Sequence, residues 1–279
     1  MRANKKTVAV ICVLCLTVFL VMLTACGGDS ASSGGTPEDN TGTETNSIRD
    51  DTASKTRTYI IVTDTVFAPF EFQSASGEFV GVDMELLAAI AEDQGFAYTV
   101  DPVGFDAALQ AVTSGQADGV IAGMSITDKR REILDFSQPY FDSGVVMGVS
   151  AEDDTIKGYE DLAGKRVAVK TSTEGEDFAE SIKAQYGFET VSFKDSSMVY
   201  EDVIAGNSQA CFEDYPVLGY AISQNVGLEI VTEMERGSSY GFAVQKGQNA
   251  ELLKMFNDGL ANLKANGTYQ EILDRYFPK

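Results

Sequence analysis

Three charged side chains come just after predicted strands, where α/β proteins commonly bind ligands. Asp64, Lys170 and Asp214 each follow a short run of apolar and β-branched residues. In open α/β sheets, ligands bind outside the carboxyl ends of the strands. These two carboxylates and one ammonium group therefore predict a ligand-binding edge.

The composition excludes several other kinds of chemistry. The 279 residues include no histidine, so the chain has no Ser-His-Asp or Cys-His pair and no imidazole base or zinc ligand. Asp and Glu number 42 against 21 Lys and Arg, a net charge of -21. Because nucleic-acid affinity comes largely from Lys and Arg, we expect no nucleic-acid partner, and we also expect no metal and no cofactor.

The N-terminus has the layout of an export signal. Basic residues precede an apolar run, Val8 to Leu23, and the sequence Leu23-Thr24-Ala25-Cys26 resembles a bacterial lipoprotein box. We predict a signal peptide over residues 1–25 and lipidation of Cys26. The alternatives are an ordinary secretory signal and an N-terminal membrane anchor. Lipidation would hold the protein on the extracytoplasmic face of the bacterial cell membrane.

Residues 26–57 are predicted to be a flexible tether. Beyond Cys26 they are mostly Gly, Ser, Thr, Asp, Glu and Asn, and Ile48 is the one sizeable apolar residue, so the segment cannot bury enough surface to offset its ordering entropy. Cys211 is then the one cysteine of the folded body, so we expect no internal disulfide.

From Thr58 onward, strand-like runs alternate with helical patterns of about ten residues, which predicts an α/β protein with mainly parallel sheets. Asp83 is placed to cap the first helix, and the stretch Tyr240 to Val244 predicts a late strand. The alternation repeats from Arg166, which indicates two similar α/β lobes.

The order of motifs resembles family 3 extracellular solute-binding proteins of amino-acid ABC importers, and most closely their glutamine-binding members. The resemblance covers Thr58 to Phe277, and its motifs include Pro69-Phe70-Glu71-Phe72, Ala122 to Arg130, Asp135 to Tyr140 and Asn266-Gly267-Thr268-Tyr269.

This resemblance implies two Rossmann-like lobes joined by a two-strand hinge, the type II periplasmic-binding-protein fold, which closes on a ligand. The expected lobes are residues 58–145 with 238–279, and residues 146–237. The family also implies a free amino acid as ligand and separate ABC permease and ATPase subunits as partners. We expect the protein to be a monomer without enzymatic activity.

The resemblance also implies how a zwitterion is held. Arg130 would grip the α-carboxylate, and Asp214 would accept the α-ammonium. For Arg130 the alternative is a solvated charge in a helix that Thr127 caps, with Arg131 beside it. For Asp214 the alternative is a cap for the helix that begins near Pro216.

Further residues of the cleft follow from the same resemblance. Backbone groups at Gly123 and the hydroxyl of Ser125 would complete these contacts, and Thr173 lies where a helix N-terminus suits an anion. Phe67 and Phe105 would sandwich the ligand, although aromatic residues at such positions are commonly core.

Asp64 and Lys170 match the positions that face the ligand's side chain in the glutamine-binding relatives. A side-chain amide would satisfy both groups, so glutamine is favoured. The alternative is a salt bridge between Asp64 and Lys170, which would leave the side-chain pocket to Phe67, Phe105 and Glu174.

Two acidic residues depart from the family pattern. Glu174 stands where a small residue is common, and Glu213 is an extra acid beside Asp214. Either could face solvent, or could favour a basic amino acid such as arginine or lysine. Glu174 is also the candidate proton donor in a different class of function, a cyclohexadienyl dehydratase-like enzyme on the same fold.

Overall fold

A computed structural model describes residues 57–277. The predicted signal peptide, Cys26 and all but the last residue of the predicted tether lie outside these residues. Within them, no helix has the length and apolar character needed to cross a membrane.

The first sheet has three neighbouring parallel strands, followed by one antiparallel strand and by an edge strand that pairs antiparallel with it. Its order is β4-β1-β5-β13-β6; β1 pairs in parallel with β4 and β5, and β13 is antiparallel to β5 and β6. The strands are β1 (Thr58–Thr63), β4 (Ala97–Pro102), β5 (Gly119–Val120), β6 (Leu134–Phe136) and β13 (Ala243–Gln245). A short hairpin, β2 (Phe72–Gln73) with β3 (Phe79–Val80), lies outside this sheet.

The second sheet repeats this plan. Its order is β11-β7-β10-β8-β9, with β12 also paired to β7; β8 is parallel to β9 and β10, and β7 is antiparallel to its three partners. The strands are β7 (Phe141–Ser150), β8 (Arg166–Lys170), β9 (Glu189–Phe193), β10 (Ala210–Asp214), β11 (Leu228–Ile230) and β12 (Glu235–Tyr240).

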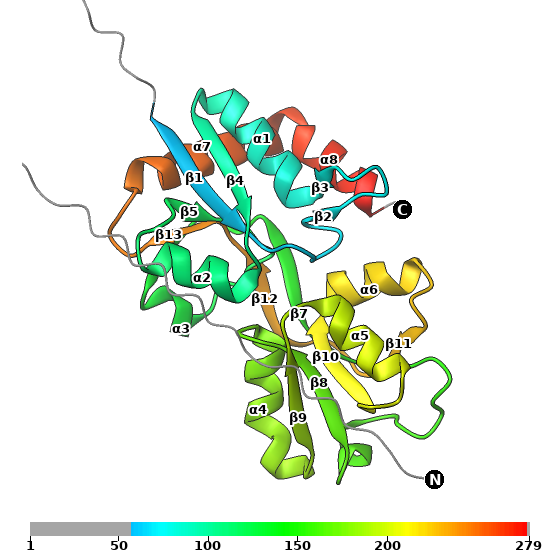
Figure 1. Ribbon diagram of the computed structural model, residues 1–279. Helices are drawn as coiled ribbons and strands as arrows, with labels where there is room; N and C mark the ends of the chain where they lie inside the picture. The colour runs from blue at the N-terminus through cyan, green and yellow to red at the C-terminus, as the bar shows by residue number, and fades with distance from the viewer. Residues whose placement is uncertain (1–56, 278–279) are drawn as a thin grey trace, which may run out of the picture. The chain divides into compact units, whose positions relative to one another are not determined.

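Helices cover both faces of each sheet (Figure 1). With the first sheet lie α1 (Val82–Gln94), α2 (Phe105–Thr113), α3 (Asp128–Arg131), α7 (Ala250–Asn266) and α8 (Thr268–Tyr276). With the second sheet lie the short 3-10 turn η1 (Tyr159–Leu162), α4 (Glu174–Tyr186), α5 (Ser196–Ile204) and α6 (Tyr215–Ser223).

Alternation along the strands divides each sheet's apolar residues between two cores. Ile61 packs in the core with α1, α7 and α8, whereas its neighbour Val62 packs with α2. In the second sheet, Val167 and Val169 belong to the core with α4, while Ala168 belongs to the core with α5. Since successive strand residues point to opposite faces, apolar residues at every position bury both faces.

The strands β7 and β12 run between the two groups of helices (Figure 1). Along β7, Phe141 packs against the core of α1, α7 and α8, and Val145 lies in the core with α4. The lobe boundaries proposed from the sequence, at 145/146 and 237/238, fall inside these two strands.

Two local predictions are wrong. Asp83 does not cap α1, because the helix begins at Val82 with Gly81 as its N-cap, and the buried Asp83 carboxylate instead accepts hydrogen bonds from Gly123 and Tyr140. The stretch Tyr240 to Val244 is not one strand: β12 ends at Tyr240 and β13 starts at Ala243. A Cβ at Gly241 would lie 2.8 Å from Ile126, so glycine lets the chain pass close to that side chain between the two strands.

Candidate functional site

The carboxyl ends of strands from both sheets meet around one small cavity. Its volume is about 10 Å³, close to the minimum for a single water molecule. Its lining includes every residue predicted for the site except Asp64, together with Glu174. The lining residues are Phe67, Phe105, Gly123, Ser125, Arg130, Lys170, Thr173, Glu174 and Asp214.

Asp64, just after β1, and Lys170, at the end of β8, form a buried ion pair between the two sheets. The second Asp64 oxygen accepts a hydrogen bond from the Thr65 backbone N–H at 2.6 Å. The Lys170 ammonium also lies 4.3 Å from the centre of the Phe67 ring. The salt bridge considered from the sequence is therefore present, and it places Lys170 against an aromatic wall of the cavity.

Arg130 lies on α3 and is buried, whereas its neighbour Arg131 is exposed. Its guanidinium donates to the carbonyl oxygen of Ser125 at 2.8 Å and to that of Ser172, beyond β8, at 2.9 Å. It also lies 5.2 Å from the Phe105 ring centre. Burial lowers the pKa of Arg130, and the nearby carboxylates of Asp214 and Glu174 partly oppose this shift. A solvated role for Arg130 is excluded by this geometry.

Asp214 ends β10 and makes no side-chain capping bond to α6. Its carboxylate instead accepts a hydrogen bond from the Tyr240 hydroxyl at 2.6 Å, and Ser143 donates to that same hydroxyl at 3.1 Å. Burial and then the neighbouring charge of Glu213 raise the pKa of Asp214 to about 7. The site therefore holds a carboxylate that titrates near neutral pH.

Tyr240 is a site residue that the sequence analysis missed. It is fully buried and is the last residue of β12. In the sequence it opens the mainly apolar stretch Tyr240 to Val244, which gives no sign that its hydroxyl bonds Asp214. The signal would have been an aromatic residue with a polar end at a predicted hinge strand.

Gly123 contributes backbone to the cavity, but its N–H already donates to Asp83 at 2.8 Å. Its carbonyl is thus the backbone group that remains for a ligand. Gly123 has φ +51, and a Cβ there would lie 2.4 Å from the Phe67 ring. Only glycine fits this approach without strain. Ser125, also buried, has its hydroxyl 3.4 Å from that of Ser238.

The start of α4 forms the opposite wall. The Thr173 hydroxyl accepts from the Glu176 N–H at 3.3 Å and donates to the Lys170 carbonyl at 2.7 Å, so it is committed to capping the helix. Glu174, the first residue of α4, is 9% exposed, and its Oε2 has no hydrogen-bond partner within residues 57–277.

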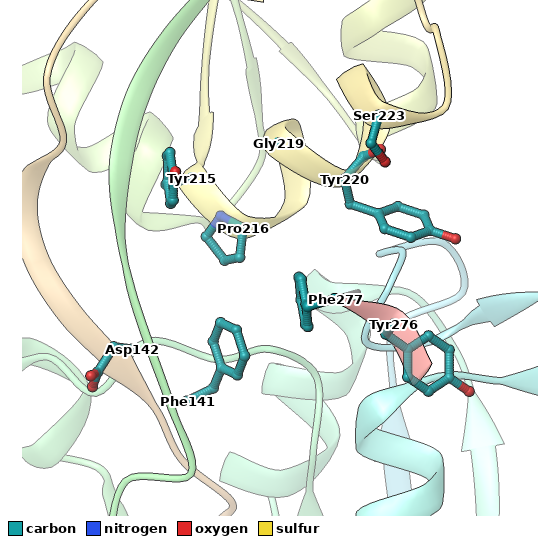
Figure 2. Close-up of a pocket in the computed structure, with 9 residues that line it drawn as sticks. All are labelled: Phe141, Asp142, Tyr215, Pro216, Gly219, Tyr220, Ser223, Tyr276 and Phe277. Atoms are coloured by element: carbon teal, nitrogen blue, oxygen red, sulfur yellow. The ribbon is translucent and has the colours of Figure 1, made fainter. Parts of the chain in front are cut away.

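A larger pocket of about 500 Å³ lies between α6, the end of α8 and the start of β7. Figure 2 shows that its walls are mainly aromatic, with the Asp142 carboxylate turned away from Phe277. That carboxylate accepts a hydrogen bond from Ser239. The pocket therefore offers no pair of opposite charges to a zwitterion. Its walls are Phe141, Asp142, Tyr215, Pro216, Gly219, Tyr220, Ser223, Tyr276 and Phe277.

Comparison with known proteins places this geometry in context. The family model described as bacterial extracellular solute-binding proteins, family 3, matches residues 59–279. The chain is 31% identical over 218 residues to the ABC transporter arginine-binding protein 1 of Escherichia coli (strain K12), an alignment that covers 76% of this chain and 88% of that protein.

Solved structures give the same picture. The second substrate-binding domain of Lactococcus lactis GlnP, in an open conformation, is 42% identical with a TM-score of 0.58, and the match covers 81% of this chain and 97% of that one. An ancestral arginine-binding protein is 37% identical; its glutamine-bound and arginine-bound structures have TM-scores of 0.73 and 0.74 and cover 80% of this chain and 98% and 99% of theirs. Of these structures, the one with the higher sequence identity thus has the lower TM-score.

Proposed function

This chain belongs to the bacterial extracellular solute-binding proteins of family 3, and we propose that it captures a free polar amino acid, with glutamine favoured, for an ABC importer. We further propose that it works as a monomer, anchored by lipid on Cys26 to the extracytoplasmic face of the membrane, and delivers the amino acid to a permease driven by an ATPase.

One observation carries this proposal: buried Arg130 and buried Asp214, on elements of different sheets, line the same cavity. A zwitterion needs a cationic partner for its carboxylate and an anionic partner for its ammonium. A guanidinium can donate five N–H bonds, of which Arg130 uses two within the described residues. The rest suit a carboxylate, and Asp214 suits the ammonium.

With Asp64 and Lys170 paired to each other, Lys170 is the member that supports glutamine as the favoured ligand. The pair is neutral overall, yet Lys170 retains N–H donors and Asp64 retains acceptor capacity. Asp64 does not line the cavity, so a side-chain amide meets this pair through Lys170, which can donate to the amide oxygen without the addition of a buried charge. An aliphatic side chain would leave Lys170 without a ligand partner.

A second candidate is a basic amino acid, and Glu174 is the observation that favours it. This buried residue lines the cavity, and its Oε2 has no partner among residues 57–277. The relatives support both candidates, because the ancestral arginine-binding protein was solved with glutamine and with arginine.

Entry of the ligand requires the two lobes to part. The cavity of about 10 Å³ is too small to admit an amino acid. Contacts between the lobes include Arg130 to the Ser172 carbonyl oxygen at 2.9 Å and the Ser172 hydroxyl to the Asp106 carboxylate at 2.8 Å. Rotation of one lobe lowers a TM-score without changing either lobe. The lower score of the open relative, despite its higher identity, supports closure about β7 and β12.

Native mass spectrometry of the protein as purified, followed by calorimetry with the free amino acids, tests the binding role. We expect glutamine to bind more tightly than arginine, lysine or aliphatic amino acids. Incubation with prephenate or arogenate should give no product, because a binding protein releases its ligand unchanged. The absence of binding to every amino acid would refute the function, and turnover would support the dehydratase alternative.

The anchor is tested by Cys26→Ser. If the cysteine carries lipid, the variant should stay uncut or be released into the medium, while its affinity for glutamine is unchanged. Cell fractionation and mass spectrometry of the N-terminus measure this. A variant that is cut normally and stays on the membrane would contradict lipidation.

A further inference from the structure

Glu174 carries the one carboxylate of the cavity wall with a solvent-inaccessible oxygen that has no partner in the described chain. The residue is 9% exposed, its Oε2 is inaccessible to solvent, and it lines the cavity with Arg130, Lys170 and Asp214. We propose that Glu174 determines ligand specificity by accepting a hydrogen bond from an N–H group at the end of the ligand's side chain. The inference rests on the proposed function, because it names the ligand class of the same site.

The charges of the site leave this role open. Lys170 is paired with Asp64, and a zwitterionic ligand would pair its carboxylate with Arg130 and its ammonium with Asp214. Glu174 then remains as an unmatched negative charge. Glu174 lies near the Arg130 charge, but its buried Oε2 has no hydrogen-bond partner. Because a buried charged oxygen without a hydrogen bond is unfavourable, a donor on the ligand would stabilise Glu174.

A purely structural role does not account for this carboxylate. An acidic residue in the first turn of a helix stabilises the helix dipole, but Glu176 and Asp177 already lie in the first turn of α4, and Thr173 caps it. Glu176 is also bonded to the Ser172 N–H and to Ser192. Glu174, by contrast, adds a buried oxygen that bonds nothing in residues 57–277.

The chemistry of the acceptor defines the ligand class. Amide, guanidinium and ammonium ends all carry N–H donors, so glutamine, arginine and lysine fit. Glutamate has nearly the shape of glutamine but ends in a second carboxylate, which Glu174 would repel. The inferred ligands are therefore amino acids whose side chains end in N–H donors, and glutamate is rejected.

The test pairs two isosteric changes, one in the protein and one in the ligand. Calorimetry measures the Kd of glutamine, glutamate and arginine for the unaltered full chain, for Glu174→Gln and for the control Glu180→Gln. Glu180 lies on the same helix, away from the cavity, and bonds Lys183 and Thr190. A thermal melt of each variant verifies that it is folded.

We expect Glu174→Gln to reduce the preference for glutamine over glutamate by about tenfold to a hundredfold, the range for one hydrogen bond to a charged group. The preference for arginine over glutamine should fall in the same variant. Both ratios should stay unchanged in Glu180→Gln.

Two results would overturn the inference while leaving the transport role intact. A uniform loss of affinity for all three ligands would mean that Glu174 contacts the shared α-ammonium. Unchanged ratios and affinities would mean that it contacts no ligand. If the unaltered protein binds no free amino acid, both the inference and the proposed function fail.

Discussion

Each sheet places a pair of buried carboxyl groups near the cleft, and the two pairs differ in what they contact. Glu71 and Asp83 lie with the first sheet, and Glu213 and Asp214 lie on β10 of the second. Burial raises the pKa of Glu71 well above its usual range and that of Asp83 to about 6, just as it raises the pKa of Asp214 to about 7.

The difference lies in what the carboxylates bond. Asp83 accepts from the Gly123 N–H and from the Tyr140 hydroxyl, both at 2.8 Å, and neither Asp83 nor Glu71 lines the cavity. Asp214 lines the cavity and accepts from Tyr240. The same chemistry thus fixes backbone in one lobe and presents a charge to the cleft in the other. Burial alone does not identify a binding carboxylate; the direction in which it points does.

Loss of Asp214 should give the largest effect on binding. Removing one partner of a buried charge pair costs about 2 to 5 kcal/mol, so Asp214→Ala should weaken glutamine binding roughly thirtyfold to a few thousandfold. Arg130→Ala should fall in the same range. Calorimetry on variants with a normal melting transition measures this, and unchanged affinity in both would remove these residues from the site.

The corresponding change in the first lobe should act on stability. Asp83→Ala leaves the Gly123 N–H and the Tyr140 hydroxyl without their acceptor, which costs about 2 to 5 kcal/mol for two buried donors. Thermal denaturation should show a Tm lower by roughly 4 to 20 °C for a domain of this size. Below the melting range, glutamine affinity should fall far less than in Asp214→Ala; an equal loss would erase the contrast between the pairs.

The pH dependence of binding and of stability should also distinguish the Glu213–Asp214 pair from the Glu71–Asp83 pair. A proton and the α-ammonium compete for Asp214, so affinity for glutamine should fall about tenfold per pH unit as the pH drops below about 7. The stability of the ligand-free protein should change in the opposite sense. The folded-state pKa values of Asp83 and Asp214 are raised, so the stability that their protonated forms contribute is lost as pH rises through about 6 and about 7. Calorimetry and thermal melts from pH 5 to 8 measure both trends; a flat affinity profile would contradict the role of Asp214.

The smallest effect should come from Glu213→Gln. This change removes the charge that, after burial, most raises the pKa of Asp214, while the amide oxygen can still accept from the Asp214 N–H at 3.0 Å. The midpoint of the affinity profile should move to lower pH, and affinity at pH 7 should improve by less than about tenfold. A midpoint that stays in place would show that Glu213 does not tune Asp214.

Much of this arrangement was predictable from the sequence. The family and the fold class were predicted from motif order and strand alternation, and the comparisons confirm both. The residues predicted at the cleft also lie together, since strand ends and helix starts are local features, although their contacts with a ligand stay predictions.

The contacts that the sequence did not reveal are hydrogen bonds between residues far apart in the chain. Asp83 has the sequence signature of a helix cap, but its bonds are to Gly123 and Tyr140, 40 and 57 residues away. Tyr240 similarly bonds Asp214 from another strand. Such contacts follow from how the elements pack, and no local pattern predicts them.

The single cysteine of the folded body offers a practical use. Cys211 is fully buried, and burial raises the pKa of its thiol, so little reactive thiolate forms near neutral pH. In a chain that begins after Cys26, one thiol introduced on the surface should therefore react alone with a dye. Tyr215 is a suitable position, because it is 52% exposed and directly follows Asp214. A fluorophore there would turn the protein into an optical sensor whose emission reports the concentration of its own ligand.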